Sequence, residues 1–318
     1  MGVFILKTVI HASLSSGNTL RRIRRNWGLY LLLLPSVVLV LCFAYKPMYG
    51  IIIAFKDFKP ALGITGSPWA DPWYKYFLKF FKSYQFKTTI TNTILINLYS
   101  LAVNFPLPII MALLINQMQA KRFKRVFQTI TYMPHFISTV VMVGLILIFL
   151  SPGSGLLGNI YKLFGMEAPN LMGKAKAFTS IYVWTDAWQH TGWDSIIYIA
   201  ALSTVDVCLY EAATIDGASK WQKLFYIDIP MLIPTAVILL IMRVGNLMSL
   251  GFEKVYLMQN NLNLSASEVI ATYVYKIGIN SAQYSYSAAI NMFNTIINFL
   301  LLICVNQISK RVSENSLW

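Results

Sequence analysis

Six long apolar runs alternate with polar segments along the chain. They cover approximately residues 27–54, 88–115, 130–150, 178–203, 231–250 and 288–308. Each run is long enough to cross the hydrocarbon core of a bilayer, which takes about 20 residues in a helix. The pattern therefore predicts an all-α integral membrane protein with six transmembrane helices.

The composition agrees with a membrane protein. Of the 318 residues, 57% are hydrophobic and 12% are charged, and this charged fraction is about half that of an ordinary soluble domain. The first apolar run is long, rich in aromatic residues and without a clear small-residue cleavage site, so we expect an uncleaved helix. Cys42, Cys208 and Cys304 are far apart and lie in or beside apolar runs, which indicates packing residues rather than disulfides.

Arginine positions orient the predicted helices. Seven of the eight arginines lie in the two tails or in the basic segment between the second and third runs, and the eighth is Arg243 in the fifth run. Lys and Arg gather on the cytoplasmic side of membrane proteins, so we expect both termini and the segment Leu209–Pro230 in the cytoplasm. Residues 1–26 would form an N-terminal tail with amphipathic character, residues 27–308 the helical domain and residues 309–318 a C-terminal tail.

Lysines follow this rule less closely than arginines. Twelve lysines and five acidic residues fall in the predicted outside segments or at the outer boundary, a net excess of 12 − 5 = 7 positive charges. Lysines at helix ends reach toward lipid headgroups, which would explain the excess. Alternatively, the outer face attracts an acidic solute or partner protein. In both cases the net charge of +14 gives no reason to expect a nucleic-acid partner.

Motifs for catalysis and for ATP binding are missing from the sequence. It contains no G-x-x-x-x-G-K-[ST] phosphate loop, no H-E-x-x-H or CxxC pair and no G-x-S-x-G elbow. The three histidines, His11, His135 and His190, are scattered along the chain. We therefore expect neither an enzyme nor a bound metal or cofactor.

The segment Leu209–Pro230 carries the most specific motif of the chain. Its acids, its mid-segment glycine and its final proline outline two short helices joined by a glycine turn. Glu211-Ala212-Ala213 is followed by Gly217 and later by Ile227-x-Ile229-Pro230. This order resembles the EAA loop of permease subunits of ABC importers, with isoleucine at position 229 where the family pattern has leucine.

Other segments resemble the carbohydrate branch of the same family. They are EAATIDGA, QTITYMPHFIS, GFEKVYLMQN, TYVYKIGI and the C-terminal SLW, and the likeness extends from about residue 24 to the end of the chain. It implies the type I ABC importer permease fold in a multi-pass protein of the bacterial inner membrane. The implied partners are a second permease, an ATPase dimer that holds ATP and Mg, an extracytoplasmic solute-binding protein and an oligosaccharide.

The resemblance also implies a role for the loop. It would form a coupling helix that docks on the ATPase, with Glu211 near the start of a short helix, where a negative charge is favourable. A solvated helix-turn-helix loop with a capping acid is the alternative. The residues that carry the expected coupling role are Glu211, Ala212, Ala213, Asp216, Gly217, Ile227 and Pro230.

Polar residues inside the apolar runs mark a candidate substrate path, because ionisable groups within the membrane are costly. The fourth run combines aromatic faces for sugar rings with acids for hydroxyl groups. An interfacial aromatic belt is the alternative. The candidates in this run are Trp184, Asp186, Trp188, His190, Trp193 and Asp194.

Three further runs carry polar stripes. Arg243 and Asn246 share one face of the fifth run, where they either line the path or pair with an acid of a neighbouring helix. Asn291 and Asn294 lie on one face of the sixth run and either bind solute or join helices. The second run has a stripe of Asn97, Ser100 and Asn104, and Pro106 and Pro108 should bend it.

The two strongest functional hypotheses differ in whether solute moves. The first is a permease of an oligosaccharide importer, and the basic outer face favours anionic fragments such as uronate oligomers of the alginate or pectin type. The second is a membrane scaffold or sensor that binds a cytoplasmic ATPase without transport. The polar stripes favour the first, because a scaffold needs no lined path.

Overall fold

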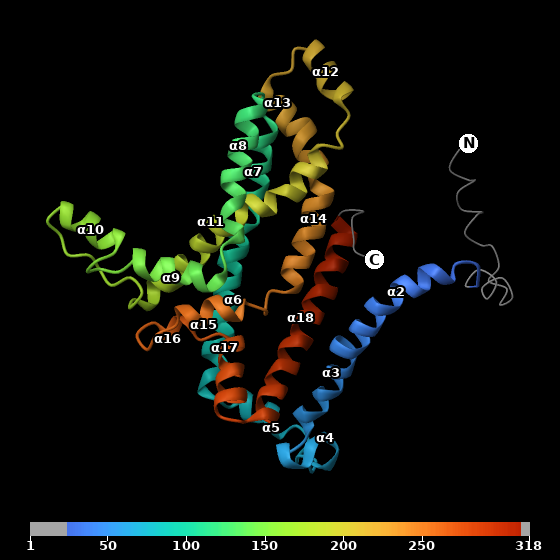
Figure 1. Ribbon diagram of the computed structural model, residues 1–318, viewed down its shortest axis with the longest axis vertical. Helices are drawn as coiled ribbons and strands as arrows, with labels where there is room; N and C mark the ends of the chain where they lie inside the picture. The colour runs from blue at the N-terminus through green and yellow to red at the C-terminus, as the bar shows by residue number, and fades with distance from the viewer. Residues whose placement is uncertain (1–23, 313–318) are drawn as a thin grey trace.

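The computed structural model describes residues 24–312, so the predictions for residues 1–23 and 313–318 lie outside it. Within the described range the chain is helical, as predicted, and its strand-like pairing is limited to one isolated bridge between Lys56 and Trp69. Figure 1 shows an elongated bundle with α12 (Val207–Ile215) at one end and α4 (Gly63–Gly66) at the other.

Among the described residues, four helical segments are long and apolar enough to cross a membrane by themselves. They are Trp27–Phe55, Tyr84–Asn116, Lys220–Gly245 and Tyr284–Arg311, which correspond to the first, second, fifth and sixth apolar runs. Two pairs of helices meet the same criterion only when each pair is taken together across a sharp bend. Length and composition thus give four spans, or six if each bent pair crosses once.

The third apolar run is not the single straight helix that the sequence predicts. α8 (Lys121–Tyr132) begins inside the expected basic loop, and α9 (Thr139–Phe149) lies at 97° to the α8 segment. Pro134 lies in the short 3-10 turn between them, and the Ser138 hydroxyl accepts a hydrogen bond from the Val141 N–H to cap α9. Average hydropathy does not register such a short break.

The second and fifth runs differ from the prediction mainly at their ends. α6 (Tyr84–Asn104) and α7 (Pro106–Asn116) are separated at Phe105, beside the prolines expected to disturb the helix. In the fifth run, α13 (Lys220–Lys223), a π-helical turn (Leu224–Asp228) and α14 (Ile229–Gly245) are continuous. The helix therefore begins at Lys220 rather than Met231, because its polar first turn lowers the local hydropathy.

α11 (Ala175–Leu202) is the central helix of the fold and corresponds to the fourth run. Its Phe178, Tyr182 and Val183 are buried in a core cluster with residues of α6, α9 and α15. Gly192 lies so close to α8 that a Cβ atom there would be 2.1 Å from the carbonyl oxygen of Thr131. The sequence thus needs glycine where these two helices approach.

Residues 251–283, predicted as an outside segment, contribute several buried side chains to the core. Val255 and Met258 of α15 (Phe252–Met258) belong to the cluster around α11, and Ile270 and Ile277 pack with Phe80 in a second cluster. Short helices separated by turns hide this burial from a periodicity analysis. The remaining helices in this region and elsewhere are α3 (Lys46–Met48), α5 (Lys75–Phe81), α10 (Leu156–Leu163), α16 (Leu264–Ser267), α17 (Ile270–Tyr275) and α18 (Tyr284–Val312).

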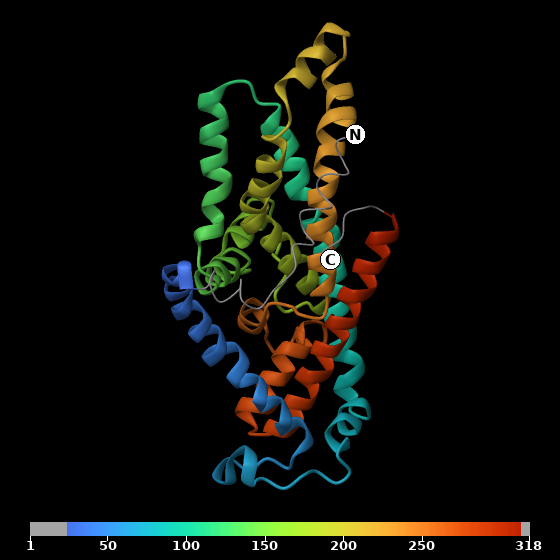
Figure 2. The same ribbon diagram turned by 90° about the vertical axis from the view of Figure 1, so that its right-hand side faces the viewer.

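The first helix stands apart from the bundle. α2 (Trp27–Val40) diverges from α18 in Figure 1 and remains separate in the turned view of Figure 2. None of its residues is buried, and the 3-10 segment Tyr49–Phe55 that follows contacts α18. The apolar surface of α2 is therefore left uncovered by the rest of the described chain.

Candidate functional site

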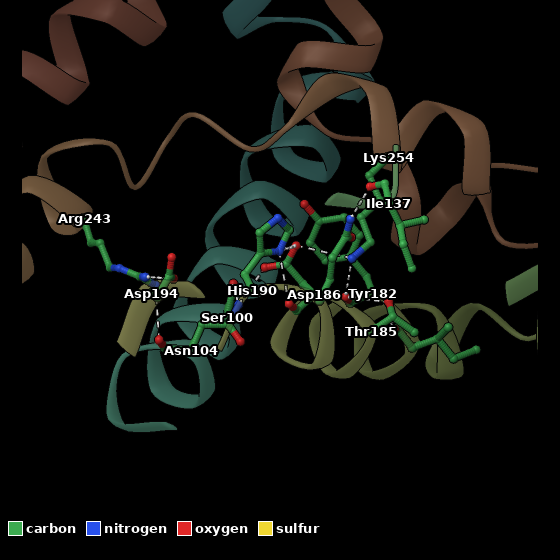
Figure 3. Close-up of polar contacts among 12 residues, drawn as sticks. Ser100, Asn104, Ile137, Tyr182, Thr185, Asp186, His190, Asp194, Arg243 and Lys254 are labelled. Carbon is green, nitrogen blue, oxygen red and sulfur yellow. Dashed lines mark hydrogen bonds and ion pairs between the residues drawn. The ribbon is translucent and has the colours of Figure 1, made fainter. Parts of the chain in front are cut away.

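Asp186 of α11 is the centre of a polar network inside the bundle (Figure 3). Lys254 Nζ lies 3.3 Å from Asp186 Oδ1, and His190 Nδ1 lies 3.4 Å from the same oxygen. The Asn104 side-chain amide donates to Asp186 Oδ2 at 2.8 Å. A carboxylate taken out of water needs such partners. Asp186 is thus held by groups from α6, α11 and α15.

Lys254 is a member of this network, although it is one of the twelve lysines that the sequence predicts outside or at the outer boundary. Only 7% of its side chain is exposed, and its ammonium lies 4.8 Å from the centre of the Tyr182 ring. The one sequence signal for it is its position in the GFEKVYLMQN segment. The predicted outer excess of seven charges therefore includes a lysine that is buried and paired.

Arg243 of α14 forms a second ion pair next to the first. Its Nη2 donates to Asp194 Oδ2 at 2.6 Å, and its Nη1 donates to the backbone carbonyl of Asn104 at 3.3 Å. Asn104 therefore contacts both pairs, through its side chain to Asp186 and through its carbonyl to Arg243. The network therefore joins α6, α11, α14 and α15. Arg243 pairs with an acid of a neighbouring helix, which is one of the two alternatives that the sequence leaves open.

Arg243 also lines a cavity of about 380 Å³ between α6 and α14. Its role in a substrate path remains a prediction. Amide and hydroxyl groups can bind sugar hydroxyls, and a guanidinium can bind a carboxylate through two hydrogen bonds. A second cavity of about 490 Å³ lies against Arg243 and Asp194. The polar lining residues of the first cavity are Asn97, Ser100, Arg243, Asn246 and Ser249.

The three tryptophans of α11 lie in different surroundings. Trp193 is stacked on His135, with ring centres 4.4 Å apart and planes at 2°. Trp184 and Trp188 are exposed and line largely apolar cavities, and the Trp184 indole N–H donates to the Tyr99 hydroxyl at 2.9 Å. The structure therefore places Trp184 and Trp188 apart from the polar network, whereas Trp193 lines the cavity of about 490 Å³ together with Asp194 and Arg243.

The asparagines of α18 are not joined to this network in the part of the chain that the structure describes. Asn291 is exposed, and the Asn294 side-chain oxygen is buried with no hydrogen-bond partner among the described residues. Their neighbour Asn298 accepts from the Met248 N–H and donates to the Ser249 hydroxyl. Asn298 thus holds α18 to the segment that follows α14, and joining helices is one of the two roles that the sequence leaves open for this stripe.

The segment Leu209–Pro230 contains two helices joined by a glycine turn, as predicted. Gly217 has φ of +74° after α12, and a capping box of Ser219 and Gln222 begins α13. Glu211 is not near the helix start, however, because it is the fifth residue of α12. Asp206 is the N-cap: its carboxylate accepts from the Cys208 backbone N–H, which lowers the pKa of Asp206 below its usual value.

The loop forms one end of the molecule (Figures 1 and 2), and apolar side chains of the loop are exposed. Ile215 is 88% exposed and Trp221 is 71% exposed. Exposed apolar side chains gathered at one place usually mark an interaction surface. Of the residues predicted for coupling, Glu211, Ala212, Asp216, Gly217 and Pro230 are exposed, whereas Ala213 and Ile227 are half-buried.

Known proteins resemble this chain in both sequence and fold. Residues 104–314 match the family described as binding-protein-dependent transport system inner membrane component. The chain belongs to this family. It is thus a permease subunit of an ABC transporter, and such subunits are not enzymes themselves.

Two relatives from Bacillus subtilis (strain 168) match nearly the whole permease. The polygalacturonan/rhamnogalacturonan transport system permease protein YteP is 38% identical over 290 residues, which are 91% of this chain and 90% of the relative. Protein LplB is 37% identical over 296 residues, which are 93% of this chain and 92% of the relative. The resemblance to ABC importer permeases is therefore confirmed.

A solved structure shows the same fold. A chain in the crystal structure of a bacterial ABC transporter involved in the import of the acidic polysaccharide alginate matches with a TM-score of 0.85 at 35% identity. The match covers 93% of the permease and 99% of that chain. A second structure of the bacterial alginate ABC transporter, in complex with an alginate pentasaccharide-bound periplasmic protein, matches with the same TM-score at 34% identity.

Proposed function

We propose that the permease forms part of the translocation path of an ATP-driven importer for anionic oligosaccharides, of the uronate type found in alginate and pectin. The observation that carries this proposal is the cavity lined by Arg243, Asn97 and Asn246, which offers one cation and several neutral polar groups. A relative named for polygalacturonan and rhamnogalacturonan transport and a matching alginate importer support the same substrate class.

The outer-face charge is weaker support for an anionic substrate than it first appears from the sequence. Lys254 is buried against Asp186, and Lys276 pairs with Glu268 at 2.9 Å. Lys75 pairs with Asp57 at 2.9 Å. Asp57 and Glu268 are already subtracted in the excess of seven charges, so only the pairing of Lys254 with Asp186 lowers it, from seven to six. The cavity beside Arg243 is therefore the better reason to expect a carboxylate on the substrate, because Arg243 has donors beyond those that bind Asp194 and Asn104.

The membrane topology of the proposal has six spans and cytoplasmic termini. It counts each bent helix pair as one span. The beginnings of α2 and α8 and the end of α18 point toward the end of the bundle that carries α12 (Figure 1). Arginines occur at all three of these helix ends, which favours the cytoplasm for this end of a bacterial inner-membrane protein.

The partners follow from the surfaces that this topology assigns. A second permease would complete the path and cover the unburied α2. An ATPase dimer, which holds ATP and Mg, would dock on the loop around Glu211 and Gly217. An extracytoplasmic solute-binding protein would deliver the oligosaccharide at the opposite end. The periplasmic protein present in the alginate transporter complex supports this last assignment.

Reconstitution of the four components tests the proposal. ATP hydrolysis should rise when the binding protein is supplied with a uronate oligosaccharide and should rise less with a neutral one of equal length. No stimulation by any oligosaccharide would contradict the importer assignment, and equal stimulation by both would contradict the anionic specificity.

A matched pair of substitutions tests the role of the cavity. Arg243→Gln combined with Asp194→Asn removes both charges of the ion pair, so that neither is left unpaired. The uronate concentration for half-maximal stimulation should rise roughly tenfold, as expected for a lost hydrogen bond to a charged group. Met242→Leu, a volume-conserving change in the same cavity wall, should leave that concentration unchanged. An unchanged half-maximal concentration in the double variant would contradict a role of Arg243 in substrate binding.

A further inference from the structure

Asp228 belongs to the loop segment Leu209–Pro230, but its side chain is not in contact with solvent as an acid of a solvated loop would be. It ends the π-helical turn Leu224–Asp228, directly before α14, and its side chain is fully buried. A buried carboxylate is strongly unfavourable unless hydrogen bonds replace its water. Lys and Arg side chains of the described residues form no ion pair with it. Neutral donors must therefore satisfy this charge.

Three donors from two other segments reach this carboxylate. The Tyr210 hydroxyl of α12 donates to Asp228 Oδ1. The side-chain amide of Gln117 donates to Oδ2 at 3.0 Å, and that of Asn116 donates to Oδ1 at 3.4 Å. Asn116 is the last residue of α7, and Tyr210 directly precedes Glu211. One carboxylate thus joins the loop helix α12 to the ends of α7 and α14.

The covalent connections of α12 are poorly suited to transmit a displacement. Before α12 the chain turns by 74° from α11, and after it comes the turn at Gly217. Both connections can bend. Hydrogen bonds from α12 to a buried group provide a lateral link that a bend does not release.

The elements on the other side of this link lead directly to the candidate substrate path. α7 continues from α6, which carries Asn97, and α14 carries Arg243. Beside Asp228, Leu113 of α7 and Leu232 of α14 are buried in one apolar cluster. Close-packed side chains transmit strain because they have little free volume. A displacement at Asp228 would therefore reach both walls of the cavity.

We propose that Asp228, with Tyr210, Asn116 and Gln117, is the internal link through which α12 moves α7 and α14. Tyr210 and Asp228 are positioning residues, because they act on the path through these helices. The link rests on the proposed function, since it presumes that an ATPase docks on α12. It is distinct from the docking surface, because the Asp228 side chain is buried within the chain.

Tyr210→Phe in the complete transporter isolates this link. The substitution keeps the ring and removes the hydroxyl that donates to Asp228. The ATPase should still co-purify and hydrolyse ATP, whereas sugar transported per ATP hydrolysed should fall roughly tenfold, as expected for one lost hydrogen bond to a charged group. Tyr226→Phe is the matched control, because Tyr226 lies in the same π-helical turn and is 80% exposed.

A rescue variant separates transmission from folding. Asp228→Asn places an amide N–H against donors and should uncouple transport in the same way. Adding Gln117→Glu returns a carboxylate to the cluster, so the double variant should recover part of the transport per ATP. Wild-type coupling in Tyr210→Phe would overturn the proposal, as would a loss of transport that only follows a loss of assembly. Failure of the wild-type complex to respond to any oligosaccharide would instead contradict the proposed function.

Discussion

Lys254→Met tests the polar network most severely, because it removes a cation that is almost completely buried. At a separation of 3.3 Å, attraction between the two charges is worth about 5 kcal/mol at an effective dielectric constant of about 20. The variant also avoids the cost of burying the ammonium, and Asp186 keeps Asn104 and His190. We therefore expect a net loss of about 2–3 kcal/mol, somewhat below the usual cost of breaking a buried pair.

Thermal unfolding of the purified permease in detergent measures this loss. The unfolding midpoint of Lys254→Met should fall clearly below that of Lys174→Met, a change at an exposed lysine at the start of α11. Lys254→Met combined with Asp186→Asn should recover much of the loss, because no unpaired charge remains. The reasoning is refuted if Lys254→Met has the same unfolding midpoint as Lys174→Met, or if the double variant is no more stable than Lys254→Met alone.

The remaining predictions concern the loop and the helix contacts. Glu211→Lys should leave the permease folded in the membrane but detach or uncouple the ATPase, and normal ATPase co-purification with normal transport would contradict this. Gly217→Ala places a Cβ at φ of +74° and should cost about 1 kcal/mol of stability, visible as a lower unfolding midpoint. Gly192→Ala forces α11 away from α8 and should cost about 1–3 kcal/mol. Gly144→Ala, with open space at the Cβ position, should be nearly neutral.

The sequence predicts the helices of this fold better than their ends and bends. The sixth apolar run appears as one continuous α-helix over Tyr284–Arg311. The first run remains one helical segment, Trp27–Phe55, although it contains Pro35 and passes through a π-helical turn into a 3-10 segment. The third run breaks at Pro134, where a 3-10 turn of a few residues redirects the chain. Hydropathy averages over about 19 residues, so it identifies membrane segments but not turns within them.

The candidate site is predictable as a set of residues but not as a set of contacts. Asp186, Asp194 and Arg243 stand out because charges inside apolar runs are rare. Their partners Lys254 and Asn104 do not stand out in the sequence. Lys254 looks like one of many boundary lysines, and Asn104 like the end of an amide stripe, because the pairing depends on how α15 and α6 pack against α11. Asp228 is one of several acids in its segment, and its burial depends on how α7 and α12 pack around the start of α14.

ATP-dependent accumulation of sugar is the most direct test of the central claim. Proteoliposomes that contain the two permeases and the ATPase should accumulate a labelled uronate oligosaccharide only when binding protein and ATP are both supplied. A vesicle preparation with Glu211→Lys in the permease serves as the control and should accumulate little. Accumulation that is equal with and without ATP, or absent for every uronate and neutral oligosaccharide tried, would contradict the account.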